Sequence, residues 1–204
     1  MNAWNQIPKQ EHILLTMKAL QENGISSVLV DTGAEAKAKV LELIPDGSEV
    51  MTMSSVTLET IGIENEINGS EKYNAVKPKL YSLDSKTQKR EQKKLGSSPE
   101  YSVGSVHAVT QDGKVIIASN TGSQLPGYSY GSDHVIWVVG AQKIVKNLDD
   151  GMARLEEHVV PLEAKHMQEK YNLPGTFVSK LLIVNRETVP GRITLIFVKE
   201  ALGY

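Results

Sequence analysis

The stretch HVIWVVG (residues 134–140) decides the fold, because five of its successive residues are apolar. A strand that is apolar on both faces must be covered on both sides, which is typical of a central strand in a parallel sheet. On its N-terminal side, SSVLVD (26–31) and EVMTMS (49–54) have strand composition, and helical patterns at 34–45 and 57–69 follow them. Strands that alternate with helices of this length predict βαβ units and a parallel sheet flanked by helices.

The remaining segments extend this pattern over residues 1–204. They are a helix at 8–23 within an N-terminal region of 25 residues, a hairpin of 102–110 and 114–119 around Asp112-Gly113, helices at 143–158 and 162–171 separated by Pro161, and a C-terminal hairpin of strands 180–187 and 192–200. The sequence therefore predicts a single three-layer α/β domain with a parallel-rich central sheet, and residues 75–100 as an inserted excursion.

Composition excludes several classes of function. The chain has no cysteine, which rules out disulfides, thiolate zinc sites and cysteine-held iron–sulfur clusters. Its net charge of −2 provides no general attraction to nucleic acid or an anionic membrane. The first residues lack the apolar core of a signal peptide, no apolar run approaches the roughly 20 residues of a membrane span, and no HExxH motif is present. We expect a cytoplasmic protein without a cofactor, a metal, a nucleic-acid partner or a membrane partner.

Residues 77–94 form a basic segment, with seven basic residues against two acidic ones. One interpretation is an arm that binds nucleic acid. The other is a solvated helix or excursion, which we favour because the segment has one aromatic residue, Tyr81, whereas proteins that bind single strands interleave several.

Two stretches fall where ligands bind in open α/β sheets, beyond the carboxyl ends of strands. The first contains Ser54, Ser55 and Thr57, between a predicted strand and a predicted helix. Hydroxyls and free amides at such a turn can bind phosphate or carboxylate. The alternative is that Ser54 or Ser55 only caps the helix.

The second stretch is ASNTGSQLPGYSYGSD (118–133), a nearly uncharged loop directly before HVIWVVG. Its candidate ligand-binding residues carry hydroxyls, amides and one glycine, and they are Asn120, Thr121, Gly122, Ser123 and Gln124. A glycine lets the backbone approach a ligand closely or adopt φ > 0. The alternative is that these residues only form turns, and that Tyr128 and Tyr130 are packing residues.

The run VGSVHAVTQDGKVIIASNTGSQLPGYSYGSDHVIWVVGAQKIVKNLDDGMARLEEHVVPLE (103–163) resembles the lactate-utilisation (LUD) domain family. MSSVTLETIGI (53–63) resembles the serine-rich turn of that family, and KLLIVNRE with VPGRITLIFVKEALG fits its C-terminal part. The resemblance covers roughly residues 35–203. It implies a fold similar to the NagB, ribose-5-phosphate isomerase and CoA-transferase group.

The resemblance also implies functions. Some members of the family act in lactate oxidation beside iron–sulfur subunits, and this cysteine-free chain resembles the component without a cluster. Members of the fold group bind sugar phosphates or CoA thioesters through serine- or threonine-rich turns. In many LUD proteins an acidic residue stands near the strand end where this chain has Asn120. No equivalent of the glutamate nucleophile of CoA transferases is evident, which leaves catalysis open.

Two hypotheses follow. In the first, the protein binds a small carboxylate or phosphorylated metabolite through the two stretches, with Lys143 or Arg192 as a partner of the anion. In the second, the protein is a non-catalytic accessory subunit that docks on a partner oxidoreductase through the glycine-rich loop 118–133. Tyr128 and Tyr130 in this loop favour the second hypothesis, since tyrosine is enriched at interface hot spots.

Overall fold

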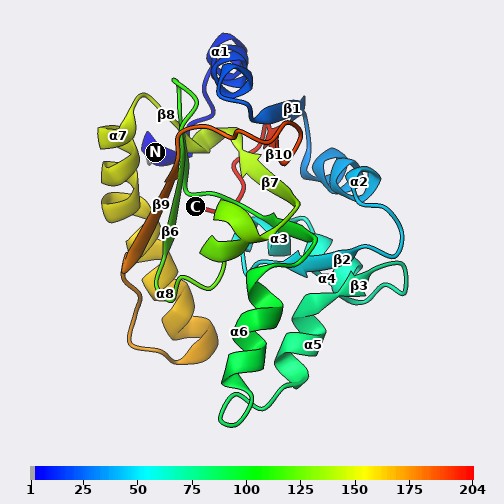
Figure 1. Ribbon diagram of the computed structural model, residues 1–204. Helices are drawn as coiled ribbons and strands as arrows, with labels where there is room; N and C mark the ends of the chain where they lie inside the picture. Colours follow the sequence, from blue (N-terminus) through cyan, green and yellow to red (C-terminus); the bar gives the residue numbers. More distant parts are fainter. Residues whose placement is uncertain (1–2) are drawn as a thin grey trace.

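The computed structural model describes residues 3–204, and a six-stranded sheet of parallel strands forms its centre (Figure 1). The order of the strands is β1-β10-β7-β4-β2-β3. Their bounds are Ser26–Val30 for β1, Ile193–Val198 for β10, His134–Gly140 for β7, Tyr101–Gly104 for β4, Glu49–Thr52 for β2 and Asn74–Ala75 for β3. β7 pairs in parallel with β10 on one side and β4 on the other, which confirms the predicted central strand.

The side chains of β7 alternate between two apolar layers. Val135, Trp137 and Val139 pack on the side of α1 (Gln10–Glu22) and a second sheet. Ile136 and Val138 pack on the opposite side, which is covered by α2 (Gly33–Leu43), α3 (Val56–Thr60) and α4 (Ile63–Asn68). Burial of one large apolar side chain contributes roughly 1.5–3 kcal/mol, so a strand that is buried on both faces anchors both layers. The predicted parallel-rich sheet flanked by helices is confirmed.

The second sheet has four strands in the order β8-β5-β6-β9, and it covers part of one face of the first sheet. Their bounds are Ile144–Val145 for β8, Ala108–Thr110 for β5, Val115–Ser119 for β6 and Lys180–Val184 for β9. β5 and β6 are antiparallel and form the hairpin predicted around Asp112-Gly113. The predicted strand 102–110 is divided between the two sheets, as β4 and β5.

Helices enclose the two sheets (Figure 1). The α-helices are α1 (Gln10–Glu22), α2 (Gly33–Leu43), α3 (Val56–Thr60), α4 (Ile63–Asn68), α5 (Val76–Ser82), α6 (Lys89–Ser97), α7 (Leu148–Arg154) and α8 (Val160–Tyr171). Short 3-10 or π segments are η1 (Ala3–Asn5), η2 (Gly127–Gly131), η3 (Ala141–Lys143) and η4 (Leu155–Val159). Helix α5 and helix α6 contain most of the basic segment and extend away from the sheets. No helix among residues 3–204 has the length and apolar character needed to cross a membrane.

The predicted C-terminal hairpin is wrong, because β9 and β10 belong to different sheets. β9 pairs antiparallel with β6, whereas β10 runs parallel between β1 and β7. β10 is almost entirely buried and suits a central position, and the half-exposed β9 suits an edge. The turn at Pro190-Gly191 therefore connects two sheets.

Two predicted helix boundaries also differ from the structure. The helical segment from Leu148 to Tyr171 continues through Pro161, which is the second residue of α8 and directly follows the π segment η4. A π segment changes the hydrogen-bond pattern of a helix, which accommodates the missing N–H of the proline. The helix predicted at 57–69 divides into α3 and α4 at Gly62, whose φ is 69°.

Candidate functional site

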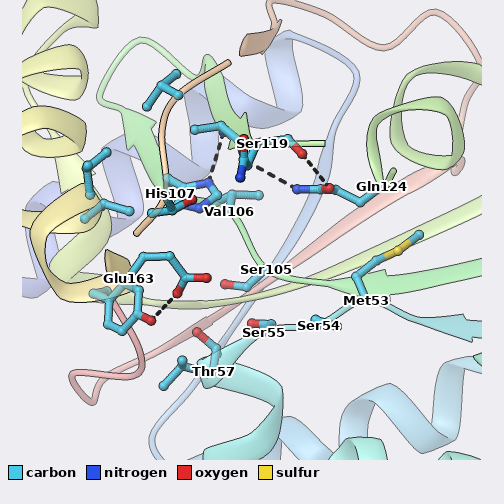
Figure 2. Close-up of a pocket in the computed structure, with 18 of the residues that line it drawn as sticks. Met53, Ser54, Ser55, Thr57, Ser105, Val106, His107, Ser119, Gln124 and Glu163 are labelled. Carbon is cyan, nitrogen blue, oxygen red and sulfur yellow. Dashed lines mark hydrogen bonds between the residues drawn. The ribbon is translucent and has the colours of Figure 1, made fainter. Parts of the chain in front are cut away.

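A cavity of about 260 Å³ lies beyond the carboxyl ends of β2, β4 and β6, with α8 along one side (Figure 2). Because β2 and β4 are parallel neighbours, the residues that follow them meet at one edge of the sheet. The polar residues that line the cavity are Ser54, Ser55, Thr57, Ser105, His107, Ser119, Asn120, Thr121, Gln124, Tyr128, Lys143, Glu163, Thr176 and Tyr204.

The turn Ser54–Thr57 presents hydroxyls that do not cap a helix. Ser55 is the N-cap residue of α3, but its side chain forms no capping hydrogen bond. The Ser54 hydroxyl oxygen accepts a hydrogen bond of 3.2 Å from Nζ of Lys77, and Lys77 also pairs with Glu64 at 2.7 Å. A hydroxyl that accepts from an ammonium group keeps its own proton for another acceptor. Ser54 is therefore oriented as a hydrogen-bond donor.

Lys143 lies behind the same turn and is only 2% exposed. Its Nζ donates to Oγ1 of Thr57, Oγ of Ser105 and the carbonyl of Val106, each at 3.1 Å. The Thr57 hydroxyl in turn donates to the carbonyl of Leu202 at 3.2 Å. The hydroxyl proton of Ser105 has no acceptor among the described residues, so Ser105, like Ser54, is a donor beside a buried lysine.

The buried charge beside the cavity is positive and has no acidic partner. No carboxylate of the described residues lies within ion-pair distance of Lys143 or Arg154. Burial, and next the charge of Arg154, lower the pKa of Lys143 to about 7. Burial lowers the pKa of Arg154 to about 10. Burial of an unpaired ammonium group costs stability, and an anion would offset that cost.

His107 contributes no charge to the cavity at neutral pH. Burial, and then the charges of Lys143 and Arg154, lower its pKa to about 3. Its Nδ1 accepts a hydrogen bond from the backbone N–H of Ala118 at 3.1 Å, which assigns the imidazole proton to Nε2. His107 therefore acts as a neutral hydrogen-bonding group.

The loop Asn120–Gln124 is more self-contained than the turn Ser54–Thr57. Gln124 accepts from the Ser119 hydroxyl at 2.9 Å and donates to the carbonyl of Ala118 at 3.3 Å. The Thr121 hydroxyl donates to Oγ of Ser123, and Asn120 accepts from the Ser179 hydroxyl, both at 3.1 Å. Most polar side chains of the loop therefore already have hydrogen-bond partners within the loop or next to it. The formation of turns explains most of the amino-acid composition of the loop.

The structure brings most of the predicted site residues together. Ser54, Ser55, Thr57, Asn120, Thr121, Gln124 and Lys143 line the cavity, whereas Gly122, Ser123 and Arg192 do not. Gly122 adopts a left-handed φ of 84° next to Lys180. Arg192 pairs with Glu187 at 2.7 Å and donates to the carbonyls of Gly127, Tyr128 and Ser132. Its role in the structure is to fix the loop before β7.

The two tyrosines of the docking hypothesis lie in different environments. Tyr128 is buried and makes an edge-to-face contact with Trp137, with ring centroids 5.5 Å apart. Tyr130 is 90% exposed. Of these two residues, only Tyr130 is accessible to a partner protein.

Several polar residues of the cavity were not predicted from the sequence, among them Ser105, His107, Glu163 and Tyr204. The sequence could have indicated Ser105, because it follows β4 as Ser54 follows β2. The prediction of one strand over 102–110 instead placed Ser105 inside a strand. Glu163 had none, since only the path of α8 brings it to the cavity. The phenol of Tyr204 donates a hydrogen bond to Oε2 of Glu163.

A second cavity of about 700 Å³ adjoins the first and shares Ser54, Ser55 and Glu163 with it. Lys77, His166 and Lys170 line its other side. The two cavities are continuous along these shared residues. Within residues 3–204, no three His, Asp or Glu side chains are arranged to hold a metal ion.

Comparisons with known proteins identify the family. The sequence profile of the LUD domain matches residues 13–198. The structure is similar to the crystal structure of a DUF162 family protein from Deinococcus radiodurans, with a TM-score of 0.59 and 14% identity over 95% of this chain and 99% of that chain. A search of curated proteins found no match. The chain belongs to the LUD domain family, and this membership supports a role related to lactate utilisation.

Proposed function

We propose that the protein binds a small carboxylate or phosphorylated metabolite in the cavity beyond β2 and β4. The anionic group accepts hydrogen bonds from the hydroxyls of Ser54 and Ser105, with the charge of Lys143 behind Ser105. Thr57 supports the ammonium group of Lys143 and keeps it beside the cavity.

The observation that carries this proposal is the burial of Lys143 without a carboxylate partner. A buried charge is usually paired or neutralised, and no acidic group among the described residues performs that function here. The hydroxyls of Ser54 and Ser105 accept from lysines, so their protons are available to an anion. Hydrogen bonds to a charged acceptor are roughly twice as strong as neutral ones.

Thermal unfolding tests the proposal with lactate, pyruvate, a sugar phosphate and a CoA ester as separate probes, each against sodium chloride at equal ionic strength. Saturation at about 100 times the dissociation constant stabilises a protein by about 2.7 kcal/mol, so a genuine ligand raises Tm measurably. We expect at least one probe to raise Tm of the wild type and to have little effect on Lys143→Met, which keeps the length of the side chain and removes its charge.

A pair of serine variants provides the matched control. Ser54→Ala with Ser105→Ala removes the two proposed donors, and we expect it to weaken binding as Lys143→Met does. Ser132→Ala removes a buried hydroxyl that bonds to Ser102 outside the cavity, and we expect it to bind like the wild type. Equal Tm shifts in the wild type and in both cavity variants would contradict the proposal.

A further inference from the structure

We infer that Glu163, oriented by Tyr204, selects ligands that carry a hydrogen-bond donor, either a hydroxyl or an ammonium group, next to their anionic group. This inference rests on the proposed function and adds a residue that determines specificity in the same site. It excludes ligands in which the neighbouring group is a carbonyl.

Glu163 lines the cavity from α8 and has one anchored oxygen. The Tyr204 phenol donates to Oε2, and no other hydrogen bond or ion pair with the described residues holds the carboxylate. In Figure 2 the carboxylate points into the cavity toward the side on which Ser105 lies. Oε1 of Glu163 therefore has its lone pairs available to a ligand.

The Tyr204 phenol donates its hydrogen bond to Glu163 throughout the neutral pH range. Burial, and next the hydrogen bond to Glu163, raise the pKa of the Tyr204 phenol above its ordinary value. The phenol therefore keeps its proton throughout the neutral range and leaves Glu163 as the acceptor. This bond also restricts the rotation of the carboxylate, so the direction of its second oxygen is set before a ligand arrives.

The cavity thus offers two kinds of polar group that require different chemistry from one ligand. Ser54, Ser105 and Lys143 provide donors or positive charge, which suit an anionic group. Glu163 accepts hydrogen bonds and repels lone pairs, so an acidic ligand binds beside it only when the ligand group nearest to Glu163 donates a hydrogen bond. A hydroxyl or an ammonium group satisfies this requirement, whereas a carbonyl places two acceptors against each other.

Four three-carbon acids test the inference, because they differ only at C2. Propionate has no polar group there, lactate has a hydroxyl, alanine has an ammonium group and pyruvate has a carbonyl. We expect calorimetric titration of the full chain to show lactate or alanine binding about tenfold more tightly than propionate, as a charge-assisted hydrogen bond allows, and pyruvate binding most weakly. The tighter of the first two identifies the donor.

Glu163→Gln is the decisive variant, since an amide both donates and accepts. We expect it to remove the preference for the donor-bearing acid and to improve pyruvate relative to propionate, a change in selectivity that a merely structural role would not produce. Tyr204→Phe releases the carboxylate and should reduce the same preference, and it serves as the test if Glu163→Gln fails to fold.

The outcomes separate this inference from the proposed function. If all four acids bind equally and Lys143→Met weakens all of them, the anion site stands and the role of Glu163 is refuted. That role is also refuted if Glu163→Gln keeps the selectivity of the wild type. If none of the acids, sugar phosphates or CoA esters binds the wild type, the proposed function fails and the inference fails with it.

Discussion

Lys77 and Lys143 are both buried beside the turn Ser54–Thr57, but their charges are compensated differently. Lys77 is 5% exposed and pairs with Glu64 at 2.7 Å. Lys143 is 2% exposed, and within residues 3–204 its ammonium group donates hydrogen bonds only to two hydroxyls and a carbonyl. Each lysine donates to a serine hydroxyl that lines the cavity, Ser54 for Lys77 and Ser105 for Lys143.

This difference distinguishes a structural charge from a functional one. The pair of Lys77 and Glu64 is complete, so removal of either partner leaves a partly buried charge. The charge of Lys143 has no carboxylate partner among the described residues, so its burial lowers the free energy of unfolding. An anionic ligand would offset that loss. Sites that bind charged ligands commonly accept such a cost in stability.

The largest effect expected from the comparison is the destabilisation caused by Lys77→Met. This change leaves the carboxylate of Glu64, whose side chain is 28% exposed, without its partner, and we expect a loss of about 1–3 kcal/mol in the free energy of unfolding. Lys143→Met removes an unpaired charge and should cost less. Urea denaturation measures both, and Glu64→Gln added to Lys77→Met should recover part of the loss. Equal losses in the free energy of unfolding for Lys77→Met and Lys143→Met would contradict the distinction between a paired and an unpaired lysine.

An intermediate effect is the pH dependence of anion binding. The pKa of Lys143 is lowered to about 7, so the ammonium form exists below that pH and is lost above it. We expect the affinity for a carboxylate to fall about tenfold between about pH 6 and pH 8. Titration calorimetry at a series of pH values measures this fall, and Lys143→Met should be insensitive over the same range.

The same pKa sets the pH dependence of the stability of the unliganded protein. The unfolded chain holds the lysine proton up to its ordinary pKa of 10.5, whereas the folded chain releases it near 7. The unfolded state therefore binds more protons between these values, and stability should rise with pH across that window. In the calorimetric titrations described above, an affinity for the carboxylate that rises with pH would show that a group other than Lys143 controls binding.

The smallest effect is expected from the exposed basic residues of α6, which contrast with both buried lysines. Replacement of Lys89, Arg90, Lys93 and Lys94 by glutamine should change stability by about 0.5 kcal/mol or less each, because α6 has no buried residue and its pair of Lys94 and Glu91 is exposed. Thermal unfolding measures the change. An affinity for nucleic acid that is sensitive to salt and lost in this variant would instead assign a function to the segment.

Local patterns in the sequence determined the elements of the fold. The apolar run of β7 specified a central strand, and Asp112-Gly113 specified a hairpin, because both signals depend on neighbouring residues. Ser54 was found as a candidate because a residue after a parallel strand must lie at the edge of the sheet where ligands bind. These conclusions required no knowledge of distant contacts.

Only the tertiary structure decided which residues meet at the cavity. The bond between Lys143 and Ser105 spans 38 positions in the sequence, that between Lys143 and Thr57 spans 86, and that between Tyr204 and Glu163 spans 41. The order of strands in the sheet and the path of α8 produce these contacts. Hydrophobic periodicity records whether a segment is buried, but not which strand or helix buries it, and for this reason β9 and β10 were wrongly paired and Glu163 was not predicted.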